Sequence, residues 1–207
     1  MRCLWCTNPE GFELSSANAT NYSIAELVDE VKRSSLMFTD GGGVTLTGGE
    51  PTMQFDEVLD FLKQLKATGI RTAIETNGSH KNLLQLLPYI DYLILDFKHP
   101  DSDTHKKWTG IGSETIIENL REIFAQKQDI LIRLTLINDF NADPALFIEF
   151  FNQFDMSNVT FEFLTYHEYG KNKWKTEYAI VDGFVGSDIL NKFTEQFKIN
   201  GLTVRRT

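Results

Sequence analysis

The sequence predicts an α/β fold in which one parallel sheet carries helices on its outside. Short apolar runs alternate with amphipathic stretches along the chain, and the apolar runs are nearly continuous, as in buried parallel strands. No repeat, low-complexity tract or long linker interrupts this alternation. Since 42% of the 207 residues are hydrophobic, the chain can form one sizeable core. We therefore expect a single domain over residues 1–207.

The elements follow one another in a regular order. A helix is expected after Ser23, because Ser23 and Glu26 have the spacing of a capping box and apolar residues then recur with a helical period. A short strand near Val44–Leu46 precedes a second helix, which ends at Gly69. The pattern then predicts strands at 70–78, 92–98, 130–137 and 159–167, and helices at 83–90, 113–126, 144–154 and about 187–198. This gives five clear parallel strands.

Charge and hydropathy exclude several classes of protein. The net charge is −9 and the isoelectric point is about 4.9, which argues against nonspecific binding to nucleic acid or to an anionic membrane surface. No apolar run reaches about 18 residues, so we expect no membrane-spanning helix, and the first residues lack the apolar core of a signal peptide. We therefore expect a cytoplasmic protein, whose cysteines bind metal or do redox chemistry.

Polar residues follow five predicted strands at the point where each strand ends. They are TGGE at 47–50, ETNG at 75–78, DFK at 96–98, Arg133 inside its strand, and YHEYG at 166–170. Each of these has an ordinary structural explanation when taken alone, although a guanidinium between Ile132 and Leu134 needs a partner. Because functional residues in such folds gather at the carboxyl ends of the strands, we expect these groups to meet on one rim.

Cys3 and Cys6 are the two cysteines of the sequence, and they have three interpretations. A thioredoxin-like pair should follow a core strand, whereas two residues precede Cys3 here. A structural zinc site needs four ligands, and the sequence has no second CxxC and no paired histidines. A CxxC spacing also suits two corners of an iron–sulfur cluster.

Six stretches together resemble the radical S-adenosylmethionine (SAM) enzymes that activate glycyl radical enzymes, such as the pyruvate formate-lyase activating enzymes. The stretches are RCLWCTNPE, GGGVTLTGGEP, ETNG, DFKHPDSDTHKKWTG, IRLTLI and YHEYGKNKW. The resemblance implies a partial (β/α)6 TIM-like barrel of the radical SAM type. It also implies that SAM is cleaved reductively at a [4Fe-4S] cluster to a 5′-deoxyadenosyl radical, which abstracts hydrogen from a glycine of a partner glycyl radical enzyme. A flavodoxin or ferredoxin would supply the electron.

The resemblance also implies roles for individual residues. Cys3 and Cys6 match the second and third cysteines of the cluster motif CxxxCxxC. Gly48, Gly49 and Glu50 match the element that holds the amino group of SAM, and relatives more often have aspartate where Glu75 stands. The full set expected to bind SAM is Trp5, Thr7, Gly48, Gly49, Glu50, Glu75, Thr76, Asn77, Asp96, Phe97, Lys98, Arg133 and His167.

The first cysteine of that motif and the first barrel strand would lie before Met1. We therefore expect a family member that is truncated at its N-terminus, lacks its first strand and has an enlarged lateral opening. Two alternatives stay open beside the activase. The chain could be a cluster-deficient, inactive remnant of such a barrel, or it could belong to another radical SAM branch, such as the activators of anaerobic ribonucleotide reductase. HKKWTG and YHEYGKNKW favour the glycyl radical branch.

Overall fold

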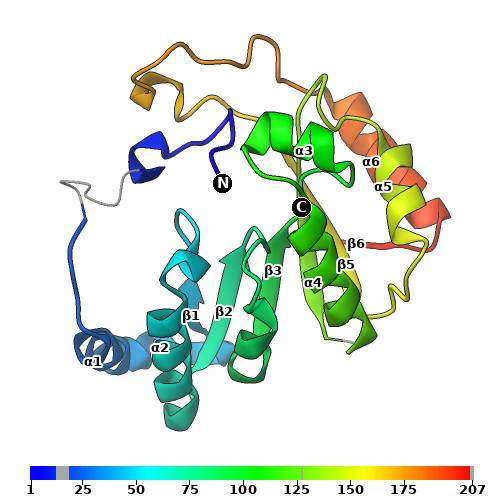
Figure 1. Ribbon diagram of the computed structural model, residues 1–207. Helices are drawn as coiled ribbons and strands as arrows, with labels where there is room; N and C mark the ends of the chain where they lie inside the picture. Colours follow the sequence, from blue (N-terminus) through cyan, green and yellow to red (C-terminus); the bar gives the residue numbers. More distant parts are fainter. Residues whose placement is uncertain (13–18, 127, 206–207) are drawn as a thin grey trace.

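The computed structural model describes residues 1–12, 19–126 and 128–205, and its centre is one six-stranded parallel sheet (Figure 1). Each strand pairs in parallel with the next strand of the sequence. β1 and β6 are the two outer strands, so the sheet is open in the described chain. The strands are β1 (Gly43–Leu46), β2 (Arg71–Thr76), β3 (Tyr92–Asp96), β4 (Ile130–Leu136), β5 (Val159–Thr165) and β6 (Thr203–Val204).

Helices connect these strands, which confirms the expected partial TIM-like barrel. The α-helices are α1 (Ile24–Ser34), α2 (Phe55–Thr68), α3 (Ser102–Thr109), α4 (Glu114–Ala125), α5 (Pro144–Phe151) and α6 (Ser187–Ile199). The 3-10 turns are η1 (Pro9–Phe12), η2 (Ser35–Met37), η3 (Thr39–Gly41), η4 (Pro51–Gln54), η5 (Leu83–Tyr89) and η6 (Lys171–Lys173). The described helices are all too short or too polar to cross a bilayer.

The helix ends follow the signals in the sequence, with exceptions. Ser23 and Glu26 form the expected capping box, and α2 ends at Gly69 with a φ of +74°. Ser113 occupies the N-cap of α4, but its hydroxyl donates to the carbonyl of Pro100 and does not cap the helix. The predicted helix at 83–90 is a 3-10 turn that contains Pro88, which cannot donate a helical hydrogen bond. The structure adds α3 and β6 to the predicted elements.

The two faces of the sheet differ in chemistry, because successive side chains of a strand point to opposite faces. Ile74, Leu93, Ile132 and Phe161 lie on the outer face and are fully buried in the main core. The other face carries polar side chains. Glu75, Asp96, Arg133 and Glu162 lie there, and the register aligns Asp96 with Arg133 and Arg133 with Glu162. The sequence therefore places a polar cluster inside the curve of the sheet.

The first residues of the chain lie at the carboxyl end of the sheet. In Figure 1 this segment runs beside α3 and beneath the long connection between β5 and α6. Hydrogen bonds fix it there, from the amide of Arg2 to the carbonyl of Thr109 and from the indole of Trp174 to the carbonyl of Cys6. The two cysteines therefore reach the edge of the sheet where the predicted site residues lie.

Candidate functional site

Lys98 lies at the centre of the rim that the strand ends and the N-terminal segment form. Its ammonium is 3.7 Å from the carboxylate of Asp96 and 5.7 Å from the centre of the Trp5 ring, and 11% of its side chain is exposed. Burial lowers the pKa of Lys98, but Asp96, Cys3 and Glu50 together outweigh it, so the pKa lies above its ordinary value. Lys98 is therefore a stable cation among groups from three parts of the chain.

Cys3 and Cys6 lie on one turn of this rim. The amide of Cys6 donates to the carbonyl of Cys3 over 3.1 Å, and both thiols are free and half-buried. Burial raises the pKa of both thiols above the ordinary value, while the ammonium of Lys98 acts in the opposite direction. The net effect favours the protonated thiols, and the cation beside the turn offsets part of the cost of forming thiolates, which are the form that binds iron.

Glu50 joins the ends of β1 and β2. One of its carboxylate oxygens accepts hydrogen bonds from the amide and hydroxyl of Thr52 (3.1 and 2.6 Å) and from the hydroxyl of Thr76 (2.7 Å). The other oxygen accepts from the amide of Asn77 over 2.7 Å. Two of these four bonds hold Thr76 and Asn77 at the rim. The expected role of Glu50 toward the amino group of SAM stays a prediction.

Replacing Glu50 with alanine is expected to lower the free energy of unfolding by about 2–3 kcal/mol, because the substitution leaves part-buried donors at Thr76 and Asn77 without an acceptor. Glu50→Gln keeps one acceptor oxygen and should lose roughly half as much. Urea unfolding of both variants, followed by circular dichroism, measures the two losses. Wild-type stability of Glu50→Ala would contradict this role.

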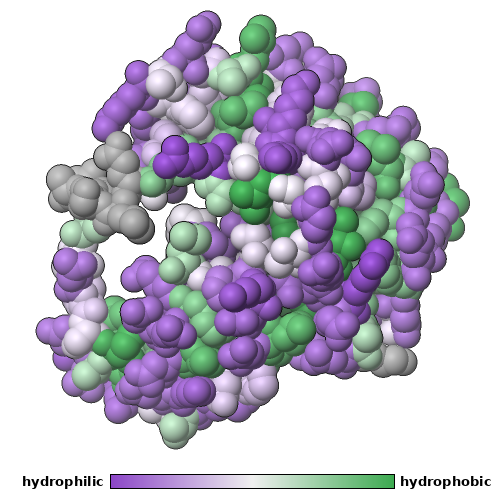
Figure 2. Space-filling view, in the orientation of Figure 1, coloured by the Kyte–Doolittle hydropathy of each residue, from purple (hydrophilic) through white to green (hydrophobic). Residues whose placement is uncertain are grey.

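Gly48 and Gly49 leave open space beside Glu50. A Cβ atom added at either position would meet no atom within 4 Å, and the φ of +130° at Gly48 favours glycine. A ligand can therefore approach the backbone closely here. Figure 2 shows the surface hollowed between the N-terminal segment and the loop that follows β1, which carries these glycines.

Arg133 lies on the inner face of the sheet between two carboxylates. Its Nε donates to Glu162 and its Nη1 to Glu75, each over 2.7 Å, and 18% of its side chain is exposed. Arg205 lies 3.9 Å from the other oxygen of Glu162. The guanidinium therefore has the partners that its position in an apolar strand required. Glu162 was missed by the sequence analysis, although a glutamate inside the apolar run VTFEFLT is a signal that could have identified it.

His167 and Thr7 lie where the connection after β5 meets the N-terminal segment. Nδ1 of His167 is buried and has no hydrogen-bond partner among the described residues, and the ring stacks on Tyr169 with centroids 4.3 Å apart. A buried polar atom without a partner requires an explanation, and a polar ligand at the rim would provide one. Thr7 packs its backbone against Gly170.

Phe97 differs from the other predicted site residues, because its side chain is fully buried in the core. It packs against Phe150 and Phe151 with ring centroids 5.2 and 5.5 Å apart. Two amides that no sequence pattern marked hold the neighbouring loops. Nδ2 of Asn141 donates to the carbonyl of Lys98, and Nδ2 of Asn119 donates to the carbonyl of Gly78.

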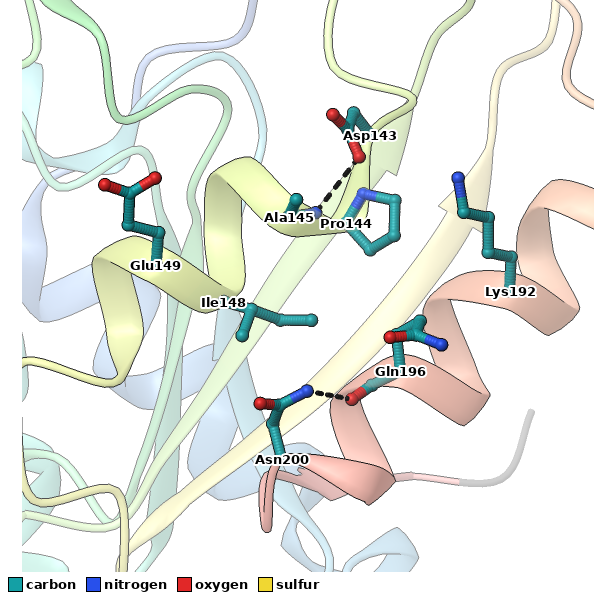
Figure 3. A pocket seen from close by; sticks show the side chains of 8 residues that line it. All are labelled: Asp143, Pro144, Ala145, Ile148, Glu149, Lys192, Gln196 and Asn200. Atoms are coloured by element: carbon teal, nitrogen blue, oxygen red, sulfur yellow. Dashed lines mark hydrogen bonds between the residues drawn. The ribbon is translucent and has the colours of Figure 1, made fainter.

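A groove between α5 and α6 lies outside this site (Figure 3). Two of its polar side chains are engaged locally, since Asp143 accepts from the amide of Ala145 and the side chain of Asn200 donates to the carbonyl of Gln196. No residue predicted to bind SAM lines it. The lining residues are Asp143, Pro144, Ala145, Ile148, Glu149, Lys192, Gln196 and Asn200.

The groups on the rim fit SAM and two ligand positions of an iron–sulfur cluster. Paired thiols suit iron, the Asp96–Lys98 pair suits a zwitterion, and the open glycines and the orphaned nitrogen of His167 leave room and a hydrogen-bonding position. Within the described residues, no group of three or more His, Cys, Asp or Glu side chains is arranged to hold a metal ion. The sequence itself supplies two thiolates.

The fold and this rim define a radical SAM domain, and a family model described as the radical SAM superfamily matches residues 1–151. The chain belongs to this superfamily and, within it, to the family of the pyruvate formate-lyase-activating enzymes. The pyruvate formate-lyase-activating enzyme of Staphylococcus epidermidis is 34% identical over 188 residues, which cover 84% of this chain and 74% of that protein. The enzyme of the same name from Staphylococcus aureus strain USA300 is 33% identical over 189 residues, covering 85% and 74%.

Solved structures show the same fold. A domain of pyruvate-formate lyase-activating enzyme from Bacteroides vulgatus superposes with a TM-score of 0.67 at 24% identity, covering 80% of this chain and 98% of that chain. A radical SAM methyltransferase from Sphaerobacter thermophilus gives a TM-score of 0.72 at 13% identity, covering 99% and 61%. These likenesses confirm the radical SAM type of the partial barrel.

Proposed function

We propose that the chain is the barrel of a radical SAM activase, which forms a glycyl radical on a partner enzyme once a third thiolate completes its cluster. The observation that carries the proposal is the ion pair of Lys98 and Asp96, 3.7 Å apart at the rim, on which the charges of Glu50 and Cys3 also act. A cation, carboxylates and thiols at one point suit a zwitterion bound beside iron. Membership in the family of the pyruvate formate-lyase-activating enzymes supports the same activity.

Each group of the rim has a distinct task in this proposal. Cys3 and Cys6 would hold iron of a [4Fe-4S] cluster, which when bound would supply the electron for the reductive cleavage of SAM. The backbone at Gly48 and Gly49 receives the amino group of SAM. Lys98 binds its carboxylate, because an ammonium has three donors and Asp96 uses one side of it.

The remaining residues orient the ligand. Glu75, Arg133 and Glu162 form a fixed polar wall, since both carboxylates hold the guanidinium. His167 offers its buried nitrogen to the nucleoside part of SAM, and Trp5 lines the rim beside Lys98. The protein thus contributes binding and orientation, while the cofactors supply the difficult chemistry.

The proposed substrate is a glycine in the backbone of a glycyl radical enzyme, and the electron donor is a flavodoxin or ferredoxin, which places the reaction in the cytoplasm. The open surface between the N-terminal segment and the loop after β1 gives a protein loop access to the rim (Figure 2). A second candidate is a cluster-deficient barrel without activity, which the count of two thiols favours.

Binding of SAM tests the proposal. The double variant Asp96→Ala/His167→Ala is expected to bind SAM about 100-fold more weakly than the wild type, a loss of about 2.7 kcal/mol. Isothermal titration calorimetry on anaerobically reconstituted protein measures the affinity. The matched control is Glu149→Ala/Lys192→Ala, which removes one acid and one base from the groove between α5 and α6.

Unchanged affinity in the site variant would remove Asp96 and His167 from the SAM site. Formation of 5′-deoxyadenosine then tests the reaction itself. Electron paramagnetic resonance with a pyruvate formate-lyase or an anaerobic ribonucleotide reductase as substrate separates the two branches. A radical signal on the reductase alone would show that the reductase is the partner and that the proposed partner is wrong.

A further inference from the structure

Gly170 lies directly against the backbone that follows Cys6. A Cβ atom added to Gly170 would lie 2.4 Å from both the Cα and the carbonyl oxygen of Thr7. The φ of Gly170 is −91°, which other residues also adopt, so its backbone conformation does not demand glycine. The close approach of the Thr7 backbone is what requires glycine at position 170. Because the opposing atoms are backbone atoms, no side-chain rotation can relieve the contact.

Trp174 holds the same segment by a hydrogen bond. Its indole Nε1–H donates to the carbonyl of Cys6 over 3.0 Å. The ring is fixed edge-on against Phe12 and Tyr178, with centroids 5.9 and 5.7 Å apart. The carbonyl of the second cysteine therefore has a rigid donor from the connection between β5 and α6.

The end of α3 holds the other side of the cysteine turn. The last carbonyls of a helix lack partners within it, and here the amides of Arg2 and Leu4 donate to the carbonyls of Thr109 and Trp108 over 2.7 and 3.0 Å. Cys3 lies between these two anchored residues. The sequence stretches HKKWTG and YHEYGKNKW thus meet at one place, on opposite sides of the cysteines.

We propose that Gly170 and Trp174 are positioning residues, which press the cysteine turn (residues 3–6) against the end of α3 and so fix both thiols at the rim. A short segment near the start of a chain frays unless other elements hold it, and here two elements do. The assignment of the thiols to iron rests on the proposed function, whereas the holding of the turn rests on the contacts alone.

Alkylation of the thiols in the iron-free chain tests this role without any cofactor. Gly170→Ala is expected to raise the rates at Cys3 and Cys6 about tenfold, since the displaced turn opens more often. Trp174→Phe, which keeps an aromatic ring but loses the donor, should raise the rate at Cys6 about threefold. Iodoacetamide labelling and mass spectrometry of the two cysteine peptides measure the rates.

Gly11→Ala is the matched control, because it adds the same methyl group nearby where a Cβ meets no atom within 4 Å. It should react like the wild type. Iron bound per chain after anaerobic reconstitution is the second readout and should fall in both test variants, with unfolding midpoints close to that of the wild type. Trp174→Phe decides the test alone if Gly170→Ala does not fold.

Wild-type labelling rates in the folded test variants would overturn the positioning role and leave the proposed function untouched. Conversely, faster labelling of both variants, together with no SAM cleavage by a chain extended with a cysteine four residues before Cys3, would refute the proposed function and retain the positioning role.

Discussion

Arg133→Met is expected to lower the free energy of unfolding by about 3–5 kcal/mol, because it removes one partner of a buried ionic cluster. The guanidinium is 2.7 Å from both Glu75 and Glu162, and without it two carboxylates share the inner face of the sheet. Glu75 is 28% exposed and Glu162 11%, so water reduces the penalty for Glu75 more than for Glu162. In a chain of this size the melting temperature should fall by roughly 6–20 °C.

A neutral triple variant is the control for this loss. Arg133→Met/Glu75→Gln/Glu162→Gln leaves no buried charge of the cluster unpaired, since Arg205, which loses Glu162, is exposed, and it should recover most of the lost stability. Arg133→Lys should lie between the two, because one ammonium cannot meet two carboxylates with the planar geometry of a guanidinium. Differential scanning calorimetry measures all three variants. If Arg133→Met had the same melting temperature as the wild type, the cluster would contribute nothing to stability.

The order of elements could be predicted from the sequence because most of them carry a periodic signal. α3 was missed because SDTHKKWT is polar; the helix is formed by a cap at each end, Asp101 and Gly110, and by the buried side chains of His105 and Thr109. β6 was not predicted because a strand of two residues is too short to show an alternating pattern. Its pairing with β5, which aligns Thr203 with Thr160, defines it, and a pairing cannot be found from one segment.

The place of the site was also predictable, because the ends of parallel strands meet at one edge. The side chains that these residues pair with could not be predicted from the sequence. Glu162 pairs with Arg133 only through the register of β4 and β5. The bond from Trp174 to Cys6 spans 168 positions of the sequence, and no local pattern indicates it. Sequence patterns thus identified the rim, while the contacts that orient its side chains depend on the folded chain.

Anaerobic reconstitution of the 207-residue chain is expected to leave fewer than four irons bound per molecule, and the product should form no glycyl radical. The sequence contains two cysteines, whereas the family motif supplies three thiolates to the cluster. Within the described residues, no cluster of His, Cys, Asp or Glu side chains replaces the third. A cubane held by two thiolates exposes an iron corner to solvent.

A thiolate added at the right distance should change this result. An extended variant that carries a cysteine four residues before Cys3 completes the CxxxCxxC spacing, and the same extension with serine adds the length without the ligand. Iron and sulfide analysis, together with electron paramagnetic resonance in the presence of SAM, compares the three proteins. Four irons with the cysteine extension and fewer with serine would assign the deficit to the ligand count, because the two extensions differ by one sulfur atom. Four irons in the 207-residue chain itself would show that another group of the protein or the solvent completes the cluster, and the deficit argued from two thiols would be wrong.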